Sequence, residues 1–323
     1  MKLEILEDEE FSLGIPTISV DEQSRNAMGG SEIMKYGLYE RLPNELKDKC
    51  QIIVSRVRAV DPNRPSLLWL HDTWEDPEAQ HLKNSASRAR FAKLIFVSQT
   101  QFQSYHLKLG VPYRESIIIR NAIDPIPQVK KDTNGPIRLI YHTTPHRGLE
   151  LLVPVFEKIY EAYPNIHLDV FSSFKIYGWP QRDVDYEEVF QRCRDHPCIN
   201  YHGYQPNDVV RKYLQQAHIF AYPSIWPETS CIAAIEAMSA GCVVVCPNLA
   251  ALPETTASFA DMYHWTEEVQ DHAQRFANQL YHSIQTYYTE NNKSRLHFQK
   301  KYVDSIFSWD NRINEWVALI RNI

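Results

Sequence analysis

Short apolar runs alternate with longer amphipathic stretches along the chain. The runs at 93–98 (KLIFVS) and 243–245 (VVV) are almost wholly apolar, as in strands buried on both faces of a parallel sheet. Further strands are predicted at 3–6, 51–55, 66–70, 116–120, 137–141, 167–171, 199–204 and 219–222. Helical spacing of apolar residues predicts helices at 29–42, 99–109, 149–163, 183–193, 207–217, 231–240, 266–288, 293–305 and 305–323. The alternation predicts an α/β protein with parallel sheets.

The stretch 220–254 combines a strand, a loop, a helix and a second strand. Thr229 and Ser230 are candidates for the N-cap of the helix, and Gly241 for the residue just beyond its end. Apolar positions recur at helical spacing at Ile232, Ile235 and Met238. The helix is therefore expected to begin close behind the preceding strand.

Two carboxylates frame this helix. Glu228 precedes it and Glu236 lies on it eight positions later, a little over two turns away. The pair is expected to line one cleft at the carboxyl end of the preceding strand, where open α/β sheets bind ligands. Spacing alone is also compatible with a solvated loop acid and a helix-face acid, because Glu32 and Glu40 are spaced in the same way.

The context of the two acids resembles the signature of the retaining glycosyltransferases of family four, which have the GT-B fold. The matching residues are Pro223, Ser224, Glu228, Glu236, Ala237, Met238, Gly241 and a later Glu254 in a Gly/Ala-rich turn. The resemblance implies that Glu228 binds the donor sugar and that Glu236 binds the nucleotide ribose. Family members usually have Gly-Phe-Gly directly after the first Glu, whereas this chain has Thr229, Ser230 and Cys231. The side chains of these three residues and of Ile232 are therefore expected to lie beside the donor.

The length of 323 residues and the resemblance together imply two Rossmann-like domains that face a cleft. The first is expected over 1–125, on the acceptor side, and a proline-containing polar linker over 126–136. The nucleotide-sugar-binding domain is expected over 137–304. The helix at 305–323 is expected to cross back onto the first domain.

Candidate residues of the first domain are Gly29, Gly30 and His71. The glycine pair opens a helix, where backbone N–H groups can approach a phosphate or sugar, although a simple N-cap turn is the alternative. His71 follows the strand at 66–70, and the resemblance implies that it contacts the donor sugar beside the reacting carbon. A lone histidine is more often structural. Asp72 is alternatively the N-cap of a following helix.

The second domain offers a polar loop from His142 to Gly148 between a strand and a helix. Such a loop suits a diphosphate. The family typically places Arg and Lys where this chain has His142 and Arg147, and we expect Arg147 to act as a phosphate clamp. The resemblance also places the turn at Gly203 and Tyr204 against the nucleotide base. The aromatic loop at 172–180 borders a sugar or base, or simply packs.

Composition narrows the functional classes. A net charge of −6 and a pI of about 6.1 disfavour a general nucleic-acid binder. The six cysteines form no Cys-x-x-Cys pair and are expected to be reduced core thiols. Four residues, Cys193, His196, Cys198 and His202, fit no common zinc spacing. An acidic N-terminus and the lack of an apolar run of ~20 residues predict a cytoplasmic protein, at most peripheral to a membrane.

The resulting hypothesis is a retaining transfer of a sugar from a nucleotide-diphosphate donor to an acceptor hydroxyl. A UDP- or GDP-sugar is the expected donor, and no metal is expected because no aspartate motif of the metal-dependent enzymes is present. The acceptor class stays open among glycan, lipid, protein and modified DNA base. The alternatives are a catalytically silent GT-B binding protein and a GT-B epimerase, which needs no acceptor.

Overall fold

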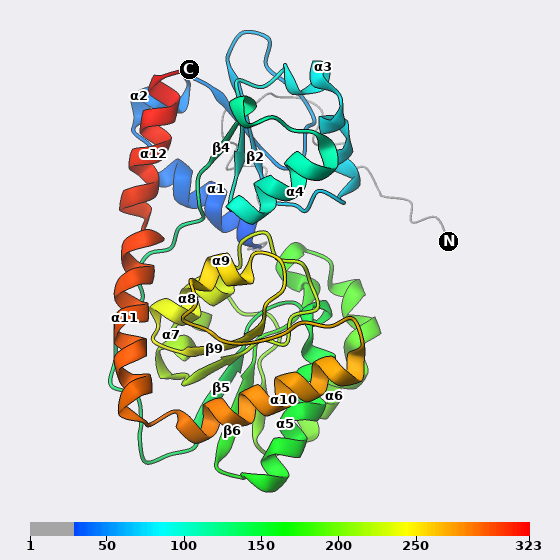
Figure 1. Ribbon diagram of the computed structural model, residues 1–323, viewed down its shortest axis with the longest axis vertical. Coiled ribbons are helices and arrows are strands. Elements are labelled where there is room, and N and C mark those ends of the chain that lie inside the picture. The colour runs from blue at the N-terminus through cyan, green and yellow to red at the C-terminus, as the bar shows by residue number, and fades with distance from the viewer. Residues whose placement is uncertain (1–28) are drawn as a thin grey trace.

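The computed structural model describes residues 29–323 (Figure 1), so the strand predicted at 3–6 lies outside the described residues. The N-terminal part contains a parallel sheet of order β1-β2-β3-β4. Its strands are β1 Gln51–Val54, β2 Ser66–Leu70, β3 Lys93–Phe96 and β4 Ser116–Ile118. Each begins where the apolar pattern predicts, and three of them end one or two residues earlier than predicted.

The C-terminal part contains a second parallel sheet, of order β10-β9-β8-β5-β6-β7. Its strands are β5 Ile137–Tyr141, β6 Ile166–Val170, β7 Ile199–Tyr201, β8 Ile219–Ala221, β9 Val243–Pro247 and β10 Asp261–Tyr263. Residues Val243 to Val245 are at most 1% exposed, as expected for a strand covered on both faces. The chain order reverses between β5 and β8, which creates a topological switch point at their carboxyl ends.

Helices cover both sheets (Figure 1). Those of the N-terminal part are α1 Gly30–Arg41, α2 Asn44–Lys47, α3 Ser85–Arg88 and α4 Gln99–Leu109. The remainder are α5 Leu149–Ala162, α6 Glu187–Asp195, α7 Asn207–Gln216, α8 Ile232–Ser239, α9 Leu252–Thr256, α10 Val269–Thr286, α11 Glu290–Ile306 and α12 Trp309–Arg321. Gly110 takes a left-handed φ of 69° at the end of α4, and Gly241 one of 71° beyond α8.

Some local predictions are wrong. The helix predicted from residue 183 is a 3-10 helix over Pro180–Tyr186, and α6 begins only at Glu187. Asp76, not Asp72, caps the 3-10 helix Pro77–Lys83, by accepting the backbone N–H of Glu78 at 2.8 Å. Glu254 lies in the short helix α9 rather than in an open turn. Prolines near the start account for the helices at Pro180–Tyr186 and α9, and the hydrogen bond from Glu78 to Asp76 accounts for the start of Pro77–Lys83.

The chain passes twice between the two parts, and the two crossings lie side by side. Ile123 donates its N–H to the carbonyl of Phe307 at 2.7 Å and accepts the N–H of Trp309 at 3.3 Å. After this point α12 packs against α1 and α2, as Figure 1 shows. Its Trp316 is 1% exposed and lies in the same apolar cluster as Met34 of α1. The C-terminal helix therefore completes the core of the N-terminal part.

The linker at 126–136 contains no helix or strand, yet it is anchored. The ammonium of Lys131 donates to the carbonyl of Gly241 at 2.9 Å, and that of Lys300 donates to the carbonyl of Ile126 at 2.6 Å. Lys131 therefore ties the middle of the linker to the C-terminal part. Its ammonium turns inward because the carbonyls at the ends of α7 and α8 need donors.

All six cysteines are free, and Cys198 alone among them is not buried. Across residues 29–323, no helix combines the length and the apolar character that crossing a bilayer requires.

Candidate functional site

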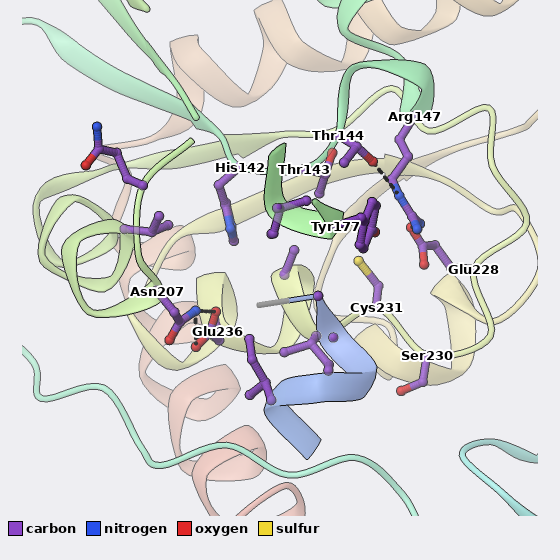
Figure 2. Close-up of a pocket in the computed structure, with 18 residues that line it drawn as sticks. His142, Thr143, Thr144, Arg147, Tyr177, Asn207, Glu228, Ser230, Cys231 and Glu236 are labelled. Atoms are coloured by element: carbon purple, nitrogen blue, oxygen red, sulfur yellow. Dashed lines mark hydrogen bonds and ion pairs between the residues drawn. The ribbon is translucent and has the colours of Figure 1, made fainter. Parts of the chain in front are cut away.

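A cavity lies between the two parts of the molecule, at the carboxyl ends of the strands of the second sheet (Figure 2). The N-terminal part contributes Gly29, Gly30 and Ile33 from the start of α1. The C-terminal part contributes His142, Thr143, Thr144, Arg147, Ile176, Tyr177, Gln205, Asn207, Val210, Glu228, Ser230, Cys231, Ile232, Ala233 and Glu236. The cavity thus occupies the switch point between β5 and β8.

Glu228 and Arg147 form a buried ion pair at one end of the cavity. Their side chains are 10% and 17% exposed, and the guanidinium donates directly to the carboxylate. The carboxylate also accepts a hydrogen bond from the hydroxyl of Tyr222, which follows β8. Burial alone would lower the pKa of Arg147, but the negative charge of Glu228 raises it well above its usual range. Arg147 is therefore a permanent cation in the cavity wall.

Gly148 explains how the ion pair forms. Its φ is 125°, and a Cβ atom there would lie 2.2 Å from the carbonyl oxygen of Pro223. The loop after β5 therefore packs directly on the loop after β8, which only glycine permits. This contact brings Arg147 beside Glu228 although the two are 81 positions apart in sequence.

Glu236 lies at the other end of the cavity and is also paired. Its side chain is 6% exposed and accepts a hydrogen bond from Arg211 at 2.7 Å and from Asn207 at 3.1 Å. Burial raises the pKa of Glu236, and the charge of Arg211 opposes that rise. Figure 2 shows Glu236 and Asn207 together, well apart from Glu228 and Arg147. The two acids frame the cavity at opposite ends, in line with the expectation that both line one cleft.

Nε2 of His142 and the hydroxyl of Thr143 are shielded from solvent within the cavity wall. The backbone of Ala233 lies beside His142, and the hydroxyl of Tyr141 lies beside that of Thr143. Burial lowers the pKa of His142 to about 3, so its imidazole is neutral. Neither atom is reached from the open cavity, so both belong to the packed wall behind it.

Two helix N-termini meet the cavity from opposite sides. Gly29 at the start of α1 and Cys231 at the start of α8 make no side-chain cap hydrogen bond. The predicted caps, Thr229 and Ser230, are therefore wrong. Thr229 instead donates its hydroxyl to the carbonyl of His71 at 2.7 Å, in the N-terminal part. Helix N-termini present N–H groups and positive potential to an anion, which at α1 is offset in part by the carboxylate of Glu32 in the first turn.

Four predicted site residues do not line this cavity: His71, Gly203, Tyr204 and Thr229. His71 contacts the ring of Trp69 at a centroid distance of 4.7 Å, and burial lowers its pKa to about 3. Gly203 forms the turn after β7 with a φ of 61°. Gln205, two residues later, lines the cavity instead.

Sequence reasoning missed several wall residues. Thr143 and Thr144 follow β5 directly, and their position in a polar loop was the available signal. Tyr177 belongs to the aromatic loop at 172–180, which the sequence placed either beside a sugar or base or in ordinary packing. Nothing local marks Asn207, which is the first residue of α7 and reaches Glu236 across 29 positions.

The two parts are hydrogen-bonded to each other beside the cavity. The carboxylate of Glu254 in α9 accepts the backbone N–H groups of Gln99 and Thr100, each at 2.9 Å. It thereby caps α4 of the N-terminal part. Ser98 donates its hydroxyl to the carbonyl of Thr229 at 2.6 Å. The contacts hold α1 over the C-terminal part, where a Cβ on Gly29 would lie 2.7 Å from the ring of Tyr177.

Within the described part of the chain, no three His, Cys, Asp or Glu side chains are grouped in a way that could hold a metal ion.

Comparisons with known proteins agree on the class of domain. Residues 138–285 match the family model described as "Glycosyl transferases group 1". One subunit of the human phosphatidylinositol N-acetylglucosaminyltransferase is 28% identical over 169 residues, which cover 50% of this chain and 33% of that protein. The Arabidopsis thaliana protein of the same name is 28% identical over 177 residues, or 52% of this chain and 37% of that protein. The chain thus matches only about a third of the length of these relatives.

Solved structures share the fold. A glycosyltransferase from Rickettsia africae has a TM-score of 0.67 at 16% identity, over 93% of this chain and 83% of that one. Anabaena HepE, solved in complex with UDP and glucose, has a TM-score of 0.65 at 15% identity, over 81% of this chain and 72% of that one. The predicted GT-B fold is confirmed.

Proposed function

We propose that this protein, whose residues 138–285 match the glycosyl transferases group 1 family model within a GT-B fold, is a retaining, metal-independent glycosyltransferase. Its donor is a UDP-sugar and its acceptor is a hydroxyl group. UDP is favoured over GDP because Anabaena HepE was solved with UDP and glucose.

The groups at the Arg147 end of the cavity carry this proposal. They are the guanidinium of Arg147 and the starts of α1 and α8, neither of which has a side-chain cap. This set supplies several hydrogen-bond donors and one fixed positive charge, which suits a diphosphate. The rest of the cavity extends to Glu236, whose carboxylate retains acceptor capacity for ribose hydroxyls.

The chemistry requires stabilisation of the negative charge that grows on the leaving diphosphate. Arg147 and the two helix N-termini supply it electrostatically, without a metal. Glu228, oriented by Arg147 and Tyr222, hydrogen-bonds the donor sugar and positions it. No second carboxylate lies beside Glu228 in the described cavity wall to act as a nucleophile. A same-face substitution, with the acceptor hydroxyl arriving beside the leaving phosphate, accounts for retention in that arrangement.

A binding screen followed by product analysis tests the proposal. Thermal unfolding is measured with UDP-glucose, UDP-N-acetylglucosamine and GDP-mannose, with and without EDTA. A ligand at 100 times its dissociation constant adds about 2.7 kcal/mol of stability. We expect a UDP-sugar to raise the midpoint equally with EDTA, and Arg147→Ala to lose the shift. Glu267→Ala, an exposed acid outside the cavity, is the matched control.

Four outcomes would contradict the proposal. Stabilisation that requires a divalent ion overturns metal independence. Inversion at the anomeric carbon, seen by NMR of the product, overturns retention. Binding without transfer to any hydroxyl acceptor favours the silent binding protein, and release of free epimerised sugar favours the epimerase.

A further inference from the structure

Two half-exposed tryptophans lie at the rim of the cavity. Trp226 is 42% exposed and Trp179 is 48% exposed. Each is in contact with a side chain of the cavity wall. The guanidinium of Arg147 lies 5.5 Å from the ring centroid of Trp226, and the ring of Tyr177 lies 5.5 Å from that of Trp179. The two indoles therefore extend the cavity onto the surface.

The two indoles are held in place by a continuous layer of side chains. His146 meets Trp226 edge-on at 4.9 Å and stacks on Phe174 at 5.2 Å. Arg182 then lies 4.2 Å from the centroid of Phe174 and 5.6 Å from that of Trp179. Burial lowers the pKa of His146 to about 3, so this link in the layer is uncharged. Rings fixed in this way lose little entropy when a ligand stacks on them.

Trp226 belongs to the C-terminal part and borders the end of the cavity where the leaving phosphate is expected. In the same-face substitution of the proposed function, the acceptor hydroxyl approaches beside the leaving phosphate. That phosphate is expected at Arg147, and the guanidinium of Arg147 lies over the ring of Trp226. A group that rests on Trp226 therefore stands next to the expected reaction centre.

We propose that Trp226, with Trp179 beyond it, forms an acceptor subsite for a polyhydroxylated ring, a saccharide or a cyclitol. This inference rests on the proposed function and names its acceptor class. A sugar ring presents an apolar C–H face that stacks on an indole, while its edge hydroxyls stay in water or reach a donor such as Arg182. The guanidinium groups beside both indoles make the rim less suited to an alkyl chain.

Saturation-transfer NMR on the full chain with saturating UDP tests the subsite. The probes are myo-inositol, methyl α-D-glucopyranoside, methyl N-acetyl-β-D-glucosaminide and lactose. We expect ring C–H signals from at least one probe, a loss of about tenfold or more in its affinity in Trp226→Ala, and a smaller loss in Trp179→Ala. Trp226→Phe, which keeps an aromatic face, should retain most of the binding.

Calorimetry with UDP separates this subsite from the donor site. All three tryptophan variants should bind UDP within about twofold of the wild type. Phe298→Ala removes an aromatic side chain that is 59% exposed on α11, outside the cavity wall, and should change neither measurement.

The subsite is overturned if wild-type protein with bound UDP gives no signal for any probe. It is also overturned if the signal survives Trp226→Ala and Trp179→Ala combined, or if Trp226→Ala abolishes binding to neutral phosphatidylcholine vesicles while leaving the probes bound. Failure of the wild type to bind UDP contradicts the proposed function instead. The probe signals recorded without UDP then still decide whether the rim binds a ring.

Discussion

The two parts of the molecule meet at one cavity but contribute different chemistry to it. Among the wall residues of the N-terminal part are two glycines and Ile33, so it offers backbone N–H groups and one apolar side chain. The charged wall residues, Arg147, Glu228 and Glu236, all come from the C-terminal part. The matched family domain lies in the C-terminal part as well. The C-terminal part therefore supplies the charged groups of the cavity, and the N-terminal part covers it.

The largest effect is expected from removing the positive charge of Arg147 in the C-terminal part. Arg147→Ala should lower the turnover number by about 100-fold or more, because one preorganised charge at a developing anion is worth that much. It also leaves Glu228 buried without its cation, so the protein should be less stable. Steady-state kinetics and urea unfolding measure the two effects. Glu228→Ala combined with Arg147→Ala should recover stability without activity, and recovery of activity would contradict the assigned role of Arg147.

The next test separates the two parts without touching the cavity wall. Glu254→Ala removes the acceptor that caps α4 from the other part, a loss of about 1 kcal/mol for a cap. The molecule should open, its radius of gyration in X-ray scattering should rise, and its affinity for UDP should fall about tenfold. Glu267→Ala should leave both unchanged. An unchanged radius of gyration in Glu254→Ala would show that other contacts suffice to keep the two parts together.

A smaller effect probes the backbone contribution of the N-terminal part. In Gly29→Ala the new Cβ atom would lie 2.5 Å from the carboxylate of Glu32 and 2.7 Å from the ring of Tyr177. Both side chains must move, so UDP affinity by calorimetry should fall severalfold with little change in stability. Adding Tyr177→Ala should restore part of the affinity. If the double variant binds no better than Gly29→Ala, the ring is not the obstacle.

The smallest expected effect is a change in folding stability with pH. Burial lowers the pKa of His71, His142 and His146 to about 3. These groups bind protons in the unfolded chain below about pH 6.5 but not in the folded one. Stability should therefore be full above pH 7 and fall progressively as the pH drops toward 3. Urea unfolding at pH 7.5, 6.5 and 5.5 should show a shallower fall in His142→Gln, whereas the exposed control His297→Gln should match the wild type.

Much of the fold could be predicted from the apolar pattern, because a strand that is buried on both faces appears in the sequence as a run of consecutive apolar residues. β5 and α4 have the predicted bounds, and Gly110 ends α4 as expected. The pairings of the site could not be predicted in this way. Arg147 meets Glu228 only because Gly148 lets two loops touch.

The incorrect prediction of an N-cap for α8 has the same cause, a contact between residues far apart in the sequence. Thr229 and Ser230 are good N-cap residues, and a local reading of the sequence favours them. The hydroxyl of Thr229 is taken by the carbonyl of His71, 158 positions away, which no local pattern reveals. Polar side chains near an interface are satisfied by whichever group the tertiary structure brings closest.

The paired crossings at Ile123 and Phe307 also bear on how the two parts could move. The two segments are joined by a single β-bridge, between Ile123 and Ser308. Two connections held together at one point favour rotation about that point over sliding of one part along the other. We expect any opening of the cavity to be such a rotation, which would separate Gly29 from Tyr177 and bring them back to the same contact on closing.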